Sequence, residues 1–429
     1  MSGMEPIILF DKSTLQSLSV DESVWFDALY YASMTPVFFV ETLADLEKEI
    51  AQGRTPEQVV GNLAEKTPTG GHINVYHATL CVHELLGQTT VEMRRVPIIA
   101  GGRPVRVGER RGTVYEEPPE RQALHRWEER RFLDVERDFA RGWRQSLSGL
   151  NLATLKADGR AIIEREGRPR DLAEALAIAR RVLERPQSRY TAGILESFRV
   201  PGNVQRRMIE RWRERGGPPI RDYAPYTAHV AIVDTLFCIG LGADLISADR
   251  PSNKIDIAYL YYLPFCMCFT SNDGLHARTA PLFLGDGQHF VPGHELKADL
   301  AKLDAHYSAL PDEVKERGVM SFAHYPPTEG DFLVSTLWDK LMVREWRERA
   351  KQPEEPRSAE RDRQLIQMIE AMGDAPRDDS AARDAEKHDA VMFQRMVPVR
   401  RGKWRLVPPE AEEAERRARD SKKGGTTPS

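Results

Sequence analysis

Cysteine is scarce in this chain, since its 429 residues include only Cys81, Cys238, Cys266 and Cys268. Four cysteines are too few for a fold stapled by disulfides. Cys266 and Cys268 lie inside an apolar run and have no second cysteine pair, so we expect neither zinc binding nor redox chemistry from them. A free cysteine in such a run behaves as a small hydrophobic residue.

Long uninterrupted apolar runs are also lacking. The best candidate, residues 228–246, is broken by His229, Asp234 and Asp244, which favours a buried helix over a membrane span. The N-terminal sequence MSGMEPIILFDKS has no basic region followed by a long apolar stretch, so a secretory signal is not expected. The sequence therefore predicts a soluble, cytoplasmic protein without a membrane partner.

Several catalytic motifs are missing as well. The sequence has no GxSxG elbow, HExxH helix or Rossmann glycine fingerprint. The glycine-rich segment GGRPVRVGERRG (101–112) lacks the Gly-Lys-Ser/Thr of a phosphate loop, and we expect a basic hairpin there. Binding of a nucleic-acid backbone is a further hypothesis for this hairpin. His77 and His83 are six residues apart, not four, so structural histidines are expected around them; a pocket with Asn74 and Glu84 is the alternative.

No charge dominates the chain, because 61 basic residues face 65 acidic ones and the net charge is −4. This balance neither requires nor excludes a nucleic-acid partner, so any binding surface must come from local clustering. One such cluster is an arginine-rich stretch mixed with acids. A solvated face with ion pairs is one interpretation of it and a nucleic-acid-facing stripe is the other. Its arginines are Arg126, Arg130, Arg131, Arg137, Arg141 and Arg144.

The N-terminal pattern predicts an α/β sheet. The apolar run PIILF (6–10) reads as a buried parallel strand that ends at Asp11, and Ser13 is expected to cap the next helix. Residues 21–33 have helical spacing, VFFV (37–40) reads as a second strand, and a helix follows from near Glu41. Strands that alternate with helices predict an open, mostly parallel sheet.

The rest of the chain is mixed. Turns and short β-like runs in residues 88–118 predict hairpins, residues 119–148 and 151–185 are expected to be helical, and so are residues 226–246, 255–263 and 294–317. FCMCFT (265–270) reads as a strand. Residues 351–390 read as a charged linker with one helical piece. The last expected elements are a hairpin around Arg401 and Gly402 and a disordered tail.

Carboxylates stand at or near the ends of the predicted strands. In an open parallel sheet the carboxyl ends of the strands are where ligands bind. Each acid alone has an ordinary explanation, as a helix cap, a first-turn acid or a turn residue. Together they would repel one another unless a cation such as Mg²⁺ or Mn²⁺ neutralised them, and such a cation supports phosphodiester hydrolysis. These acids are Asp11, Glu41, Asp45, Asp256 and Asp273.

Three segments together resemble the PIN-domain nucleases. ILFDKSTLQSL is similar to the opening motif with Asp11, and VFFVETLADLEKE is similar to the second, where Asp45 takes the acidic position and Glu41 is its rival. DIAYLYYLPFCMCFTSND is similar to the third and fourth, with Asp256 and Asp273. The resemblance covers roughly residues 6–65 and 225–290. It implies a PIN-like sheet in which Asp11, Asp45 (or Glu41), Asp256 and Asp273 hold Mg²⁺ or Mn²⁺ and act in catalysis.

The sequence departs from this family in its long middle segment, in Asp45 where Glu is usual, and in the lack of a second acid directly after Asp273. With the resemblance, we expect a PIN-like α/β core split by a large mixed insertion and followed by a helical, charged C-terminal extension. The expected divisions are a first half (1–66), the insertion (67–220), a second half with a helical extension (221–345), a charged linker (346–390), a β-hairpin (391–410) and a disordered tail (411–429).

The leading hypothesis is a metal-dependent nuclease, with RNA favoured over DNA by the resemblance alone. Lys12, His276 and Arg278 are candidates for contacts to substrate phosphate, although surface polar roles are the plainer interpretation, and basic residues of the insertion would hold the nucleic-acid backbone. The first alternative is a PIN-like scaffold or nucleic-acid-binding module without catalysis, in which Arg or Lys pairs hold some of the carboxylates. A metabolic α/β enzyme with a helical lid is the second.

Overall fold

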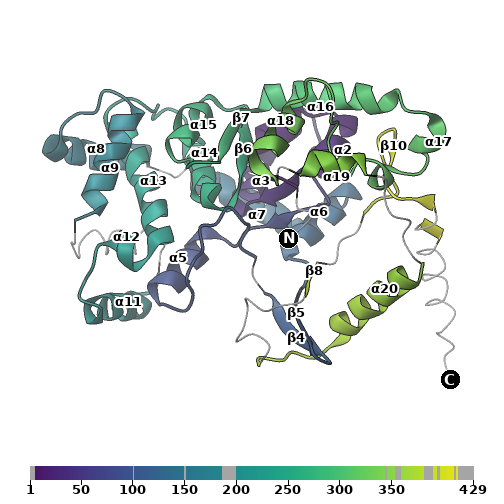
Figure 1. The fold of residues 1–429 in the computed structure, drawn as a ribbon. Coiled ribbons are helices and arrows are strands. Elements are labelled where there is room, and N and C mark those ends of the chain that lie inside the picture. The colour runs from purple at the N-terminus through teal and green to yellow at the C-terminus, as the bar shows by residue number, and fades with distance from the viewer. Residues whose placement is uncertain are drawn as a thin grey trace.

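Figure 1 shows the fold of the chain in a computed structural model. The structure describes residues 5–99, 101–148, 151–185, 200–343, 345–352, 359–380, 390–393, 397–409 and 412–413.

A five-stranded sheet lies at the centre, and all of its strand pairs are parallel. Its order is β3-β2-β1-β6-β7, so β1 is flanked by one strand from nearby in the sequence and one from far away. Ile8 of β1 pairs with Ala32 of β2 and with Cys268 of β6. The strands are β1 (Ile7–Phe10), β2 (Tyr31–Met34), β3 (His72–Ile73), β6 (Cys268–Ser271) and β7 (His289–Pro292).

Both faces of this sheet are buried, as the continuous apolar character of β1 requires. Ile8 and Phe10 enter one hydrophobic core, whereas Ile7 and Leu9 enter the other, because side chains alternate along a strand. Helices that contribute to the first core include α1 (Lys12–Ser17), α2 (Val20–Leu29), α4 (Pro56–Ala64), α6 (Pro119–Glu128), α7 (Asp134–Ser148), α16 (Gly293–Ser308) and α18 (Leu333–Leu341).

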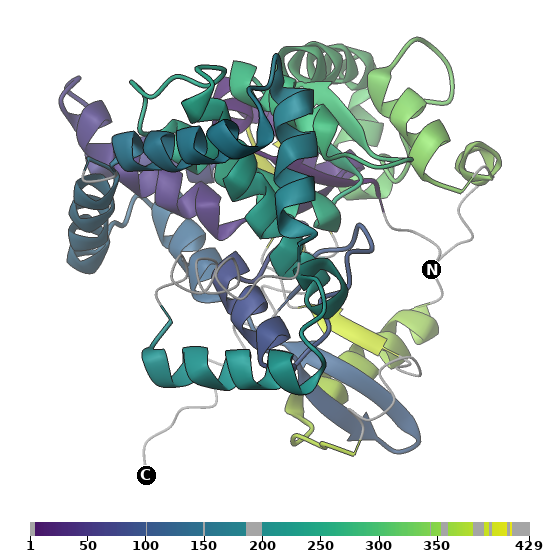
Figure 2. The ribbon, with the colours of Figure 1, turned by 90° about the vertical axis from the view of Figure 1, so that its left-hand side faces the viewer.

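The second core continues into a layer of helices, which faces the viewer in Figure 2. Its central member is α13 (Pro225–Gly242), which packs against α8 (Leu152–Glu166) and α9 (Leu172–Leu183). A Cβ at Gly159 would overlap the backbone of Cys238, so glycine is what lets α8 and α13 approach so closely. Neighbouring helices are α5 (His77–Leu85), α11 (Gly202–Glu214), α12 (Ile220–Tyr223), α14 (Asn253–Ala258) and the 3-10 helix η1 (Tyr259–Phe265).

Helix α13 is the one described helix that is long and apolar enough to cross a membrane by length and composition. Two thirds of it (67%) is buried inside the fold, which is how the core helix of a soluble protein behaves. Glu84 caps its N-terminus by accepting bonds from the backbone N–H groups of Tyr226 (3.2 Å) and Thr227 (2.8 Å). A buried helix, as predicted, therefore accounts for this apolar run.

Two small β structures complete the fold. β4 (Arg103–Val107) and β5 (Arg110–Tyr115) form a hairpin that β8 (Ala390–Phe393) extends, and α20 (Ala359–Asp374) packs on it, at the bottom of Figure 1. The second is the hairpin of β9 (Arg400–Arg401) and β10 (Trp404–Arg405), which lies against α2. The other elements are α15 (Gly274–Thr279), η2 (Ala280–Leu282), α17 (Asp312–Lys315), η3 (Val319–Ser321) and α19 (Trp346–Lys351).

The predicted α/β class with a parallel sheet is confirmed, and so are the first strand and the hairpin around Arg401 and Gly402. The strand predicted at residues 37–40 is wrong, because these residues belong to α3 (Pro36–Ile50), and the second strand is β2. The predicted cap at Ser13 is also wrong, because Asp11 caps α1. The predicted tail, residues 411–429, lies outside the described residues except for 412–413.

Candidate functional site

The strand order reverses between β1 and β6, since the chain passes from β1 to β2 and β3 on one side and from β6 to β7 on the other. In open parallel sheets the ligand crevice lies outside the carboxyl ends of the strands at such a reversal. Asp11 directly follows β1, and Asp273 comes two residues after the end of β6. The two predicted acids are therefore at the position where sheet topology favours a site.

Asp11 is 3% exposed, yet its carboxylate is fully hydrogen-bonded. Oδ1 accepts from the backbone N–H of Thr14 (2.9 Å) and thereby caps α1. Oδ2 accepts from the hydroxyls of Ser13 and Ser271, both at 2.7 Å. Asp11, directly after β1, is therefore linked to the neighbouring strand β6 through the hydroxyl of Ser271.

His276 is fully buried beside Asp11. Its Nε2 donates to the backbone carbonyl of Asp256 (2.6 Å), and its Nδ1 lies 2.7 Å from Ser271 Oγ and 3.5 Å from Asp11 Oδ2. The one hydroxyl hydrogen of Ser271 goes to Asp11, so Nδ1 is left to donate as well and the ring carries a positive charge. His276 and Asp11 therefore form a buried ion pair.

The pKa values agree with this pairing. Burial lowers the pKa of His276, but the hydrogen bond to Asp11 and its negative charge raise it more, to about 9. Burial raises the pKa of Asp11, but its interactions with His276, Ser271 and Ser13 lower it by more, so that this pKa is below its ordinary value. Both groups are therefore charged near neutral pH.

Lys12 is a second buried cation, 5% exposed, at the first position of α1. Its ammonium donates to Asp45 and lies 3.9 Å from Glu41 Oε1. Glu41 also accepts from the hydroxyl of Tyr259 (2.6 Å). Burial raises the pKa of Glu41 to about 7, with Lys12 opposing the rise and Asp11 adding to it. Glu41 and Asp45 lie on one face of α3, as predicted, and share one cation.

Asp256 lies in the first turn of α14, and its carboxylate makes no hydrogen bond or ion pair with any residue that the structure describes. Burial raises its pKa to about 7; His276 opposes the rise, and the charges of Asp273, Glu41 and Asp11 add to it. Asp273 is the N-cap of α15 and accepts from the backbone N–H of Leu275 (2.6 Å). The mutual repulsion shows that Asp11, Glu41, Asp256 and Asp273 act on one another.

We call these residues the acidic cluster. They are Asp11, Glu41, Asp45, Asp256 and Asp273, with Lys12 and His276 as their cations.

The donor chemistry of the acidic cluster fits a hard divalent cation, because its free oxygens all belong to carboxylates. Within the described part of the chain, however, no three His, Cys, Asp or Glu side chains stand ready to ligate a metal ion. Lys12 draws Asp45 to itself, and His276 draws Asp11. Asp256, Asp273 and Glu41 are the carboxylates that no short ion pair holds among the described residues. A cation would relieve the repulsion that raises the pKa values of Asp256 and Glu41.

The candidate phosphate contacts are placed unequally. His276 and Lys12 are buried with their polar atoms bonded, so in this conformation neither reaches a substrate, and their role is to neutralise carboxylates. Arg278 is exposed and donates to the backbone carbonyls of Leu245 (3.2 Å) and Gly274 (3.4 Å). Sequence reasoning missed Ser271 and Tyr259 as hydrogen-bond partners of the acids, although both stand in the segment DIAYLYYLPFCMCFTSND that carries the resemblance.

The competing constellations have structural explanations. Glu84 caps α13, and Asn74 bonds Ser33 Oγ (2.8 Å), so neither lines a pocket with His77. All four cysteines are free. In the arginine-rich stretch, every arginine whose side chain the structure describes is engaged in ion pairs, which favours the solvated-face interpretation. The arginines of the 101–112 hairpin that contact α20 and the residues after it are Arg103, Arg106 and Arg110.

The main cavities of the described structure are not at the acidic cluster. One of about 180 Å³ is lined by Glu5 and Tyr31, at the amino ends of β1 and β2, and one of about 430 Å³ lies next to it, because His324 lines both. The acidic cluster therefore lies at the carboxyl end of the sheet, whereas these two cavities lie at the amino end.

The fold and the site define the class as an α/β protein with a parallel sheet and a buried acidic cluster at its switch point. Comparison with known proteins adds nothing to this class: no family model matches the chain, and no curated protein or solved structure matches it significantly.

Proposed function

We propose that the chain is a metal-dependent, PIN-like nuclease whose reaction takes place at the acidic cluster. The observation that carries the proposal is the crowding of carboxylates at the switch point, where Asp256 has no hydrogen-bonding or ion-pairing partner and its pKa is raised to about 7. Perturbed carboxylates of this kind gather at functional sites more often than elsewhere. The resemblance of the three sequence segments to PIN-domain nucleases supports the same conclusion.

Asp256, Asp273 and Glu41 are the side chains that would hold Mg²⁺ or Mn²⁺, with Asp11 behind them. If all five acids are ionised, their charge of −5 exceeds the +2 of Lys12 and His276 by three, so one divalent cation can be accommodated. When bound, the metal would activate a water and stabilise the leaving oxygen of a phosphodiester. The part of Lys12 and His276 is to hold Asp45 and Asp11 in place.

The substrate is proposed to be a nucleic acid, with RNA ahead of DNA on the resemblance alone. Arg278 is the exposed cation nearest in sequence to Asp273, and its guanidinium is anchored only by two backbone carbonyls. An arginine so placed can still offer N–H groups to a phosphate.

A PIN-like scaffold or nucleic-acid-binding module without catalysis is the second candidate, and one observation favours it. Lys12 and His276 pair with Asp45 and Asp11, so cations of the chain itself take up two of the five carboxylates. In a scaffold, the role of the acidic cluster would be to form these structural ion pairs. The two candidates therefore differ in whether Asp256 and Asp273 bind a metal.

The deciding experiment uses the full chain and the variants Asp256→Asn and Asp273→Asn. Asn caps a helix about as well as Asp, so the second variant keeps the cap of α15. Asp138→Asn, on an exposed acid of α7, is the matched control. Mn²⁺ binding is measured by calorimetry, and cleavage is measured on single- and double-stranded RNA and DNA, with EDTA as a further control.

A nuclease should bind Mn²⁺, cleave at least one substrate and stop in EDTA. Each cluster variant should lose about tenfold or more in metal affinity and most of its cleavage, whereas the control keeps both. If the wild-type protein binds no Mn²⁺ and leaves every substrate intact, the nuclease proposal fails and the scaffold replaces it. Asp11→Asn is the poorer test, because it also breaks the ion pair with His276.

A further inference from the structure

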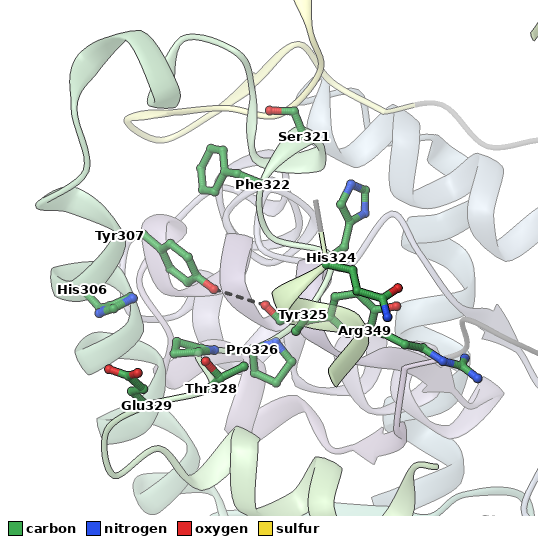
Figure 3. A pocket seen from close by; sticks show the side chains of 13 residues that line it. His306, Tyr307, Ser321, Phe322, His324, Tyr325, Pro326, Thr328, Glu329 and Arg349 are labelled. Carbon is green, nitrogen blue, oxygen red and sulfur yellow. Dashed lines mark hydrogen bonds between the residues drawn. The ribbon is translucent and has the colours of Figure 1, made fainter. Parts of the chain in front are cut away.

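The larger cavity, of about 430 Å³, lies between the C-terminal end of α16, the loop of residues 321–329 and α19 (Figure 3). Its volume is within the range of about 300–1,000 Å³ that small-molecule sites occupy. Helix α16 begins directly after β7, at the carboxyl end of the sheet, and Tyr307 is 14 residues further on. At 1.5 Å per residue the cavity is about 21 Å from that end. It is a separate place from the acidic cluster.

The wall of this cavity is fixed by bonds from outside it. Ser335 Oγ donates to the carbonyl of Pro327 (2.8 Å), and Arg347 Nη1 donates to the carbonyl of Thr328 (2.5 Å). Arg347 is itself held by the carboxylate of Asp339 through two bonds of 2.7 and 2.8 Å. A cavity whose loop is ordered in advance costs less to fill, because little conformational freedom is lost on binding.

Aromatic rings dominate one part of the lining. Tyr307 stacks on Trp25 behind it, with ring centroids 4.3 Å apart, and its hydroxyl donates to the carbonyl of Tyr325 (3.4 Å). Phe322 is 5.8 Å from Tyr307 at an angle of 46°, and His306 and His324 also line the hollow. Rings held in this way offer stacking surfaces to a flat ligand. Ser321 and Thr328 are part of the same lining, and their hydroxyl oxygens can accept hydrogen bonds from polar edges of a ligand.

The charged groups of the lining stand at opposite sides. Figure 3 shows Glu329 on the side of His306 and Arg349 on the side of His324, with the rings between them. Neither side chain makes a hydrogen bond or an ion pair among the described residues, and both are exposed. A guanidinium matches the geometry of a phosphate, and a carboxylate accepts from hydroxyl or amino groups. The ligand thus needs an anionic end, a flat ring and a donor end.

We propose that this cavity binds a nucleoside monophosphate unit. The base lies among Tyr307, Phe322 and Tyr325, the phosphate meets Arg349, and the ribose hydroxyls or the amino group of the base donate to Glu329. The unit can be a free nucleotide or one residue of a single strand, because the two share this chemistry. The inference does not depend on the nuclease proposal, since the cavity is at the other end of the sheet.

The test is calorimetric titration of the full chain with AMP, UMP, adenosine, inorganic phosphate and a ten-residue oligoadenylate, without divalent metal so that no strand is cut. Arg349→Gln should weaken AMP binding about tenfold or more and leave adenosine binding unchanged, because only the phosphate contact is lost. Glu329→Gln should weaken both ligands. Phe322→Leu, which keeps the bulk but not the ring, should do so as well.

The control is Arg215→Gln, an exposed arginine on another surface, which should bind AMP like the wild type. AMP bound as tightly as the oligonucleotide supports a free nucleotide, whereas a tighter oligonucleotide supports a strand. Absence of saturable binding for every nucleotide and the oligonucleotide would overturn the proposal. Binding that neither Arg349→Gln nor Glu329→Gln weakens would overturn it too, since the site would be elsewhere.

Discussion

The two ends of the central sheet are built on different principles. At the carboxyl end, five acids and two cations are packed against one another, and two of the carboxylates have pKa values raised to about 7. At the amino end there are two cavities, and beside the larger one aromatic rings stack and hydrogen bonds to the carbonyls of Pro327 and Thr328 fix a loop. Crowded charge costs stability and is kept only where something outside the fold compensates for it, whereas stacked rings contribute stability.

This contrast predicts opposite signs for substitutions at the two ends. Removing an unpaired carboxylate charge at the carboxyl end should stabilise the chain, and removing a ring at the amino end should destabilise it.

The largest effect is expected for Trp404→Ala. Trp404 is 2% exposed, packs edge-on against Trp25 at 4.7 Å and donates to Asp304 Oδ1 (2.7 Å). Because Trp25 in turn backs Tyr307, the substitution removes the support of the ring stack as well as its own burial. We expect a loss of about 3–5 kcal/mol in the free energy of unfolding, measured by denaturant titration. Tyr76→Ala, at an exposed ring, is the control and should cost far less. A loss below about 1 kcal/mol for Trp404→Ala would contradict the view that the rings support this end.

A smaller effect of opposite sign is expected for Asp256→Asn. A carboxyl group whose pKa is raised on folding stabilises the fold below its unfolded pKa, near 4, and loses that contribution as the pH rises through about 7. At pH 8 the wild type therefore has a destabilising buried charge that the variant lacks. The free energy of unfolding of the variant should be higher by on the order of 2–3 kcal/mol. The gain should vanish at pH 4, where Asp256 is protonated.

The measurement is thermal unfolding of both proteins from pH 4 to pH 8 without divalent metal. Asp138→Asn, at an exposed acid of α7 outside the acidic cluster, is again the control. A variant less stable than the wild type at pH 8 would show that Asp256 is structurally paired, and the contrast between the two ends would fail.

The smallest effect is expected for truncation after Glu413. The removed residues are charged and then rich in Gly, Thr and Ser, a composition that buries little apolar surface. The midpoint of thermal unfolding should therefore stay within about 1 °C. Truncation before Val397 is the matched comparison, because it also removes Trp404 and should lower the midpoint strongly. A loss of several degrees for the shorter truncation would mean that the tail docks on the folded chain.

Part of the fold could be predicted because its signals are local. The run before Asp11 has the apolar character of a buried strand, and Gly402, with φ of 55°, supplies the turn between β9 and β10. VFFV was misleading because α3 lies between both cores. Val37 faces one core and Phe38 and Phe39 face the other, so this part of the helix has no polar side and looks like a strand.

The acids of the candidate site could be proposed from the sequence, but their cations could not. Lys12 meets Asp45 across 33 residues, and His276 meets Asp11 across 265, and no spacing rule links residues so far apart. His276 therefore looked like a phosphate contact beside Asp273. In the fold it is buried against Ser271 and charged by its neighbour. A single sequence carries the residue types of a site, and the fold decides which of them neutralise each other.

The central position of β1 also determines how long this strand waits for its partner β6 during synthesis of the chain. β1 pairs with β6, so Ser271 reaches Asp11 only after 260 further residues have been made. At about 5–20 residues per second, that takes roughly 10–50 s of synthesis. During this interval β1 can pair with β2 on one side, but its other edge, built of Ile7, Ile8, Leu9 and Phe10, has no strand to meet. An open apolar edge invites pairing with other chains, so aggregation threatens the unfinished chain most during this interval.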